Sequence, residues 1–192
     1  MHADWLTIEL RARGASFARF NTEDYPQQVG LAWDERCGHL RLPTGDVPLE
    51  GVTAVRYRRP VPPRMPPEMP AAQAAWARSE AREALLGVWR TLNARWVNHP
   101  DRNRVAESKL HQLRTAGRLG FEIPPTLVTN EPDRARRFLE SANGSAICKP
   151  IYDGRVPTGV DEGVFFTSRV DADTAPLHDL GPEPYMFQSL VT

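Results

Sequence analysis

The chain has 192 residues, more than one average domain and fewer than two large ones, so two small domains or one domain with an appendage are expected. Lysine and arginine together number 24 and are balanced by 24 acidic residues, which makes the formal net charge zero. This balance provides no overall electrostatic attraction to nucleic acid or to an anionic membrane. A small-molecule or protein partner is therefore favoured, and no binding to nucleic acid or membrane is expected.

The sequence shows no sign of a membrane span or of an oxidising compartment. No apolar run approaches the roughly 20 residues that cross a bilayer. Asp4 and Glu9 stand where a signal peptide would be basic and then apolar. Cys37 and Cys148 lie far apart, without a CxxC partner or a histidine at metal-binding spacing. We expect a cytoplasmic protein with two reduced, buried thiols.

The amino-terminal half begins with a predicted helix that starts near Trp5 and ends at Gly14, and the alternating residues 15–20 then predict a half-buried strand. A helix that leads into a strand is typical of a βαβ unit, so we expect that a first strand is missing from this start. Further short strands are expected at residues 29–33, 39–42 and 52–57. The last of these is predicted to be a central strand that ends at Arg58-Arg59-Pro60.

A proline-rich segment separates these strands from the next predicted helix. Six prolines fall within residues 60–70, which favours an extended, semi-rigid connector, with a ligand for an aromatic groove as the alternative. Apolar residues spaced three and four apart then predict a helix from Ala71 to about Trp96, and Pro100 prevents its continuation. We therefore predict domains at residues 1–97 and 98–192.

The second predicted domain starts with a helix over residues 103–119 that ends at Gly120. Its apolar face comprises four small or apolar residues, Ala106, Leu110, Leu113 and Gly117. Lys109 lies off this face, on a separate stripe with Val105 and Gln112. Lys109 is therefore expected to point away from the core.

The remaining elements are predicted strands around one further helix. The strands are expected at residues 126–129, 146–149, 164–170 and 185–191. Asn130 should cap a helix that carries Pro132 in its first turn and stops at Asn143-Gly144. A glycine-containing loop, residues 153–163, follows the strand that ends in Lys149.

Lys109 and Lys149, 40 residues apart, are candidate phosphate ligands, because each sits on a rigid element without an obvious carboxylate partner. A lysine at a strand end followed by a glycine-containing loop can neutralise phosphate charge while the backbone approaches the nucleotide. Neither a GxxxxGK[ST] nor a GxGxxG motif occurs in the chain. The alternative for Lys149 is a solvent-exposed strand end.

The order of several segments resembles the ATP-grasp ligases and, within them, the graspetide or microviridin-type peptide maturases. These segments are Asn98-His-Pro100, the helix with Lys109 and Gln112, Gly120 to Asn130, Cys148-Lys-Pro150 and Met186 to Val191. Tyr57-Arg-Arg-Pro60 and the tryptophan-bearing helix are similar to the domain that precedes the ATP-grasp core. The resemblance implies an α/β fold: a pre-ATP-grasp domain with a parallel-leaning sheet, then an ATP-grasp small subdomain with an antiparallel sheet and helices.

The resemblance also implies which residues hold the nucleotide. Lys109 and Lys149 match the two nucleotide-contacting lysines, with the Lys149 ammonium against the ATP phosphates. The hinge strand is matched by Gln188, Ser189, Leu190 and Val191, where backbone groups around Ser189 and Leu190 would contact the adenine edge. The loop at residues 153–163 matches the mobile phosphate cover of the family, although it has fewer glycines than expected.

In the family, ATP and Mg²⁺ activate a carboxylate of a ribosomally made precursor peptide as an acyl phosphate, and a hydroxyl or amine then forms an ester or amide. The magnesium ligands would follow Thr192, so we expect the chain to be incomplete and inactive alone. Whether it forms a homodimer is left open. The alternatives are another ATP-grasp ligase, similar to glutamyl ligases or glutathione synthetase, and a non-catalytic module that binds a leader peptide.

Overall fold

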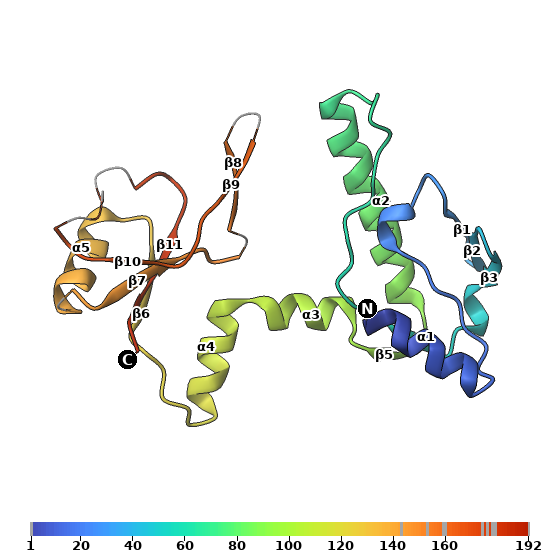
Figure 1. Ribbon diagram of the computed structural model, residues 1–192, viewed down its shortest axis with the longest axis horizontal. Helices are drawn as coiled ribbons and strands as arrows, with labels where there is room; N and C mark the ends of the chain where they lie inside the picture. The colour runs from blue at the N-terminus through green and yellow to red at the C-terminus, as the bar shows by residue number, and fades with distance from the viewer. Residues whose placement is uncertain are drawn as a thin grey trace. The chain divides into compact units, whose positions relative to one another are not determined.

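The chain forms two compact units, Met1–Pro100 and Asp101–Thr192, in a computed structural model (Figure 1). The structure describes residues 2–142, 144–152, 154–158, 161–173, 175, 177 and 180–191. Within these ranges, no helix is both long and apolar enough to cross a membrane. Each unit is described below by itself.

The first unit combines helices with two small sheets. Its elements are α1 (His2–Ala12), η1 (Thr22–Asp24), β1 (Gly30–Trp33), β2 (Gly38–Leu42), β3 (Gly45–Pro48), η2 (Leu49–Gly51), β4 (Ala54–Arg56), α2 (Ala71–Thr91) and β5 (Arg95–Val97). Strands β1, β2 and β3 (Figure 1) form an antiparallel sheet in that order. Strand β4 pairs with β5 in parallel.

The core of the first unit lies between β2 and α2. Leu40 and Leu42 are buried at alternate positions of β2, because successive side chains of a strand point to opposite faces. Helix α2 presents Leu85, Val88 and Trp89 to the same cluster, with the three- and four-residue spacing of one helix face. The predicted strands near residues 29–33 and 39–42 are thus confirmed as β1 and β2.

Helix α2 is shorter than the sequence predicts, and the end at Trp96 is wrong. The backbone leaves the helix at Leu92, whose ψ is 117°, and Arg95–Val97 becomes β5. Parallel pairing with β4 determines this end, while Trp96 still packs against the core, now from a strand. Trp96 therefore has the spacing from Trp89 that a helix would give, although the helix ends before it and Trp96 lies in a strand.

The strand predicted at residues 52–57 is present but shorter, and it is not central in a sheet. Strand β4 covers Ala54–Arg56, and within the described ranges its ladder partner is β5 alone. The amino-terminal half is accordingly not parallel-leaning, because its larger sheet is antiparallel and its parallel sheet has two strands. The parallel pair and α2 form a βαβ connection, which requires a long crossover.

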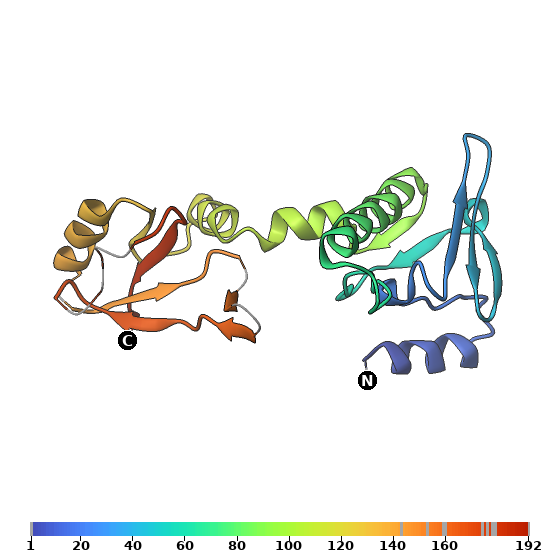
Figure 2. The ribbon, with the colours of Figure 1, turned by 90° about the horizontal axis from the view of Figure 1, so that it is seen from above.

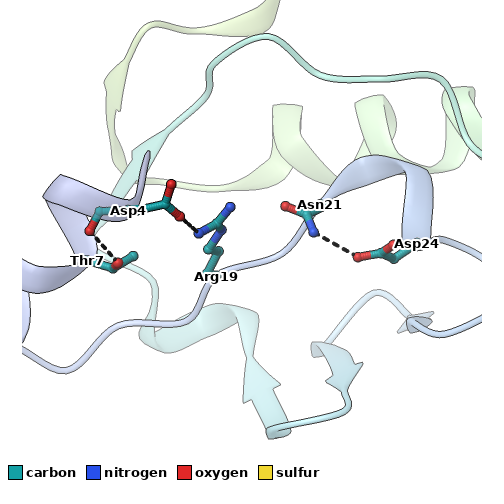
Figure 3. Close-up of polar contacts among 5 residues, drawn as sticks. All are labelled: Asp4, Thr7, Arg19, Asn21 and Asp24. Atoms are coloured by element: carbon teal, nitrogen blue, oxygen red, sulfur yellow. Dashed lines mark hydrogen bonds and ion pairs between the residues drawn. The ribbon is translucent and has the colours of Figure 1, made fainter. Parts of the chain in front are cut away.

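Helix α1 ends as predicted, but the segment after it is not a strand. Gly14 has φ +66°, a conformation that suits glycine after a helix. Residues 15–20 carry no ladder; instead, Arg19 donates to the Asp4 carboxylate at 2.6 Å and ties the segment to α1 (Figure 3). The apolar residues that alternate in this segment have other partners than a sheet: the Phe17 ring contacts the Arg11 guanidinium, and Phe20 packs against Trp89.

The two cysteines are both free thiols in different surroundings. Cys148 is buried, and burial raises the pKa of its thiol to about 11. Cys37 is exposed, so the prediction of a buried thiol is wrong there. It lies in the turn between β1 and β2, where Asp34 Oδ1 accepts the N–H groups of Arg36 and Cys37 at 2.8 and 2.9 Å.

The second unit carries an antiparallel sheet and the helices around it (Figure 2). Its elements are α3 (Pro100–Glu107), α4 (Lys109–Arg118), β6 (Thr126–Thr129), α5 (Pro132–Ser141), β7 (Ala146–Lys149), β8 (Arg155–Thr158), β9 (Asp161–Val164), β10 (Ser168–Val170) and β11 (Tyr185–Ser189). The sheet order is β10-β7-β11-β6, and all three pairings are antiparallel. The predicted strands at residues 126–129, 146–149 and 185–191 are confirmed, the last ending two residues earlier.

One face of this sheet packs against α5. Cys148 on β7 and Phe187 on β11 face each other across the ladder and join Ala135 and Leu139 of α5 in one buried cluster. Helix α5 starts one residue later than predicted: its N-cap is Glu131, and the Asn130 side chain donates to the Pro182 carbonyl at 3.3 Å instead. Asn143, at its predicted stop, lies outside the described residues.

The single helix predicted at residues 103–119 is two helices. The chain leaves the helical conformation at Ser108, with ψ 110°, and the Ser108 hydroxyl accepts the His111 N–H at 3.4 Å as the N-cap of α4. The predicted apolar face is therefore wrong, since Leu110 is 48% exposed. The predicted end at Gly120, with φ +84°, is confirmed.

The glycine-containing loop predicted at residues 153–163 is largely a β-hairpin. Strands β8 and β9 pair antiparallel, and Phe165 N–H donates to the Gly154 carbonyl at the base of the hairpin. The predicted strand at residues 164–170 is accordingly divided between β9 and β10, with residues 165–167 outside any ladder. Asp153, Gly159 and Val160 lie outside the described residues.

The burial of two leucines of the second unit predicts that their replacement by alanine has very different effects on the free energy of unfolding. Leu139 is 1% exposed in the cluster under α5, and Leu119 is 71% exposed. Leu139→Ala should lower the free energy of unfolding by about 2–5 kcal/mol, because it removes packed methyl groups and leaves a cavity. Leu119→Ala should change it by less than about 0.5 kcal/mol. Urea titration followed by circular dichroism measures both, and similar losses would contradict the assigned core.

Candidate functional site

Lys149 and Gln188 lie on the face of the sheet opposite α5. In the β7–β11 ladder Cys148 is opposite Phe187, and Ile147 is opposite Gln188. Because side chains alternate along a strand, the packing of Cys148 and Phe187 under α5 assigns Lys149 and Gln188 to the other face. The face opposite α5 thus carries Lys149 and Gln188 together with two apolar residues, Ile147 and the fully buried Met186.

A chain of hydrogen bonds connects the polar side chains of this face across three strands. Lys149 Nζ donates to Gln188 Oε1 at 2.7 Å, and Gln188 Nε2 donates to Thr126 Oγ1 at 2.8 Å. The Thr126 hydroxyl donates in turn to the Pro124 carbonyl at 2.8 Å. Gln188 is only 7% exposed, so these partners satisfy a buried amide that would otherwise be destabilising.

Lys109 reaches the same region from the first turn of α4. Its Nζ donates to the Ile151 carbonyl at 2.9 Å and to the Tyr152 carbonyl at 3.4 Å. These carbonyls belong to the segment that directly follows β7, two and three residues after Lys149. The structure therefore brings together the two lysines that the sequence singles out.

The electrostatics of the pair favour a bound anion. The pKa of Lys149 lies below its usual value, first because partial burial disfavours the charged ammonium and second because the Lys109 charge repels it. Neither ammonium forms an ion pair with a carboxylate of the described residues. Two neighbouring cations without a counter-ion among the described side chains form a site that a phosphate group would stabilise.

The amino-acid composition also supports a specific role for the two lysines. Of the 24 Lys and Arg residues two are lysine, Lys109 and Lys149, so the remaining 22 are arginine. An ammonium is a compact point charge on a flexible stem, whereas a guanidinium is a rigid planar fork. Both lysine ammonium groups of this arginine-rich chain are located at one site. The lysine count was available from the sequence and would have separated the pair from ordinary surface cations.

The predicted hinge residues have backbone groups that are partly engaged. Ser189 N–H donates to the Pro125 carbonyl at 2.9 Å, and Leu190 N–H donates to the Ser145 carbonyl at 2.7 Å. Val191 is 73% exposed. An adenine edge at this position would therefore meet the carbonyl groups of Ser189 and Leu190 or the backbone of Val191. Their contact with a nucleotide stays a prediction.

Thr126 is a site residue that the sequence analysis missed. Its part in the hydrogen-bond chain depends on the β6–β11 register, which pairs Thr126 with Gln188, 62 positions later in the chain. For metal binding, the side chains that the structure describes contain no group of three His, Cys, Asp or Glu arranged around one point. No magnesium ligand is therefore assigned among the described residues.

The fold of the chain is similar to that of a solved ATP-grasp ligase. More specifically, the family model described as the MvdD pre-ATP grasp domain matches residues 3–104, over half of the chain, and the chain belongs to this family. The assignment agrees with the resemblance seen in the sequence. No curated protein matches the chain.

Three solved structures illustrate the similarity. The macrocyclase MdnC of Microcystis aeruginosa MRC, bound with precursor peptide MdnA, has a TM-score of 0.85 and 26% identity over 95% of this chain. A RiPP-associated ATP-grasp ligase of Chryseobacterium gregarium, in complex with ADP and a leader and core peptide, has a TM-score of 0.82 and 28% identity over 97% of this chain. The macrocyclase MdnB of M. aeruginosa MRC has a TM-score of 0.76 and 29% identity over 95% of this chain. The chain spans 62%, 58% and 61% of their respective lengths.

The coupling between the two lysines can be measured directly. Lys109→Met removes one charge and should raise the pKa of Lys149 towards 10.5, because the repulsion is lost. Lys109→Arg keeps the cation and should leave that pKa low. Since Lys149 is then the sole lysine, its Nζ gives a single signal in lysine-labelled NMR titrations. An unchanged pKa in Lys109→Met would contradict the coupling.

The same coupling between the two lysines predicts how the free energy of unfolding changes with pH. The folded-state pKa of Lys149 is depressed, so between that pKa and 10.5 the unfolded chain binds more protons. The free energy of unfolding should therefore rise with pH in this alkaline window. Lys109→Met should flatten the rise, which a urea titration repeated across the window would show.

Proposed function

We propose that this chain contains the nucleotide-binding lysines of an ATP-dependent carboxylate ligase that matures a ribosomally made peptide. The observation that carries the proposal is the convergence of the chain's two lysines, which have no carboxylate partner among the described residues. Lys149 would contact the ATP phosphates from the end of β7, and Lys109 would contact them from the start of α4. Both ammonium groups could donate to phosphate oxygens while α4 and β7 keep their present backbone conformation.

The adenine would lie at the end of β11. The assigned hinge residues are Gln188, Ser189, Leu190 and Val191. The carbonyl groups of Ser189 and Leu190 and the backbone of Val191 would contact the edge of the base, since the Ser189 and Leu190 N–H groups are already engaged. Gln188 has a more restricted part than its neighbours, because its side chain is already bound to Lys149 and Thr126. It would hold the phosphate-binding lysine rather than read the base.

The reaction proposed for the whole protein is ligation through an acyl phosphate. A side-chain carboxylate of the peptide attacks the γ-phosphorus and ADP leaves; a hydroxyl or amine of the peptide then attacks the acyl carbon and phosphate leaves, forming an ester or amide crosslink. This chemistry depends on charge neutralisation and positioning, which is what two rigidly held ammonium groups supply. Mg²⁺ would neutralise further phosphate charge, with ligands outside the described residues.

The peptide substrate is supported by the relatives rather than by a contact in this chain. MdnC is a macrocyclase solved with its precursor peptide, and the Chryseobacterium ligase is solved with a leader and core peptide. Both match this chain along nearly all of its length. We therefore propose a precursor peptide as the partner, in a soluble, cytoplasmic setting.

Nucleotide titration tests the proposal. Lys149→Ala should weaken ATP or ADP binding tenfold or more, because a hydrogen bond to a charged group contributes about 1.5–3 kcal/mol and about 1.4 kcal/mol corresponds to tenfold. Arg118→Ala removes a cation from the exposed end of α4 and should leave affinity unchanged. Calorimetric titration in the presence of Mg²⁺ measures both.

Two outcomes would overturn this assignment. One is equal nucleotide affinity in the wild type and Lys149→Ala. The other is a chain that binds a precursor peptide tightly and no nucleotide at all, which would favour a peptide-binding module over a ligase.

A further inference from the structure

The hydrogen-bond chain from Lys149 to Pro124 has one direction. The Lys149 ammonium can only donate, so the Gln188 amide must present its oxygen, Oε1, to it. The amide nitrogen then faces β6 and needs an acceptor there. If the amide were rotated by half a turn, its NH₂ group would face the ammonium, and two donors would oppose each other.

Thr126 supplies the acceptor that selects the correct orientation. Its Oγ1 lies 2.8 Å from Gln188 Nε2, and its own hydrogen is directed to the Pro124 carbonyl at 2.8 Å. With that hydrogen engaged, the hydroxyl offers lone pairs to Gln188, not a donor. The backbone carbonyl thus fixes the hydroxyl, the hydroxyl fixes the amide, and the amide oxygen receives the ammonium.

We propose that Thr126 is a positioning residue for the nucleotide-binding lysine, acting through Gln188. The inference rests on the proposed function, because it assigns to Thr126 the placement of the ammonium that meets the phosphates. It extends the site to β6, a strand that contributes none of the assigned nucleotide ligands. Thr126 needs no contact with the nucleotide for this role.

The proximity of Thr126 and Gln188 follows from the sheet. The β6–β11 ladder sets the two residues directly opposite each other, and opposite residues share a face. Valine at position 126 would match the shape of threonine but accept no hydrogen bond. Gln188 Nε2 would then lose its partner at a position that is 7% exposed, and the amide would no longer be held with its oxygen towards Lys149.

The test compares Thr126→Val with Thr126→Ser in the full chain. NMR of lysine-labelled protein gives two Nζ signals, one for each lysine, and Lys109→Arg assigns them. Thr126→Val should lower the pKa of Lys149 by about 0.5 or more, because the ammonium loses a fixed acceptor. Thr126→Ser keeps the hydroxyl and should preserve the wild-type value. The Lys109 signal should stay unchanged in both variants and reports that the site remains folded.

A double-mutant cycle separates positioning from a general effect on folding. In a Gln188→Met background Thr126→Val should cause no further change in the pKa of Lys149, because its effect passes through the Gln188 amide. The proposal is overturned by an unchanged pKa in Thr126→Val, by an equal fall in Thr126→Ser, or by a full additional fall in the Gln188→Met background.

ADP titration of the same variants distinguishes this proposal from the function on which it rests. We expect several-fold weaker ADP binding in Thr126→Val and wild-type binding in Thr126→Ser. If the wild-type chain binds no ADP, the proposed function fails, and with it the nucleotide role of Thr126. The pKa measurements, made without nucleotide, still decide whether Thr126 orients Gln188.

Discussion

The candidate site depends on the register of β11 between β7 and β6. This register places Gln188 next to Ile147 on one side and Thr126 on the other, while Phe187 packs beneath α5. A shift of one residue would exchange the two faces of β11, so that Gln188 would lie under α5 and Phe187 would lie beside Lys149. The apolar core thus determines where the polar side chains of the sheet lie, and the sheet positions Lys149, while Lys109 comes from the first turn of α4.

The ammonium groups and their surroundings act together. Each lysine donates to oxygen atoms of the protein, Lys109 to two backbone carbonyls and Lys149 to an amide. These neutral acceptors hold the side chains in place without cancelling their charge, as a carboxylate would. A phosphate group that approaches the pair would gain from both charges and relieve the repulsion between them. An arginine at either position would bring a wider, planar group with a different set of donors.

The features that could be predicted from the sequence are those set by local chemistry. Gly14 and Gly120 end helices as expected, and Lys149 does stand at the end of a short buried strand. Features set by distant partners were missed or misplaced. Trp96 keeps helical spacing but belongs to a strand that pairs with residues 54–56, and Thr126 joins the site only through the register of β11. Neither partner can be identified from periodicity, because periodicity describes a segment alone.

The break at Ser108 has a further consequence for the field around Lys109. In one continuous helix Lys109 would lie in the middle, where the aligned peptide dipoles leave little net charge. The break makes it the first residue of α4, beside N–H groups that carry partial positive charge. Part of the attraction for an anion bound here would therefore come from the backbone itself. Unlike the ammonium groups, this part does not titrate, so it would persist at a pH where the lysines have lost their protons.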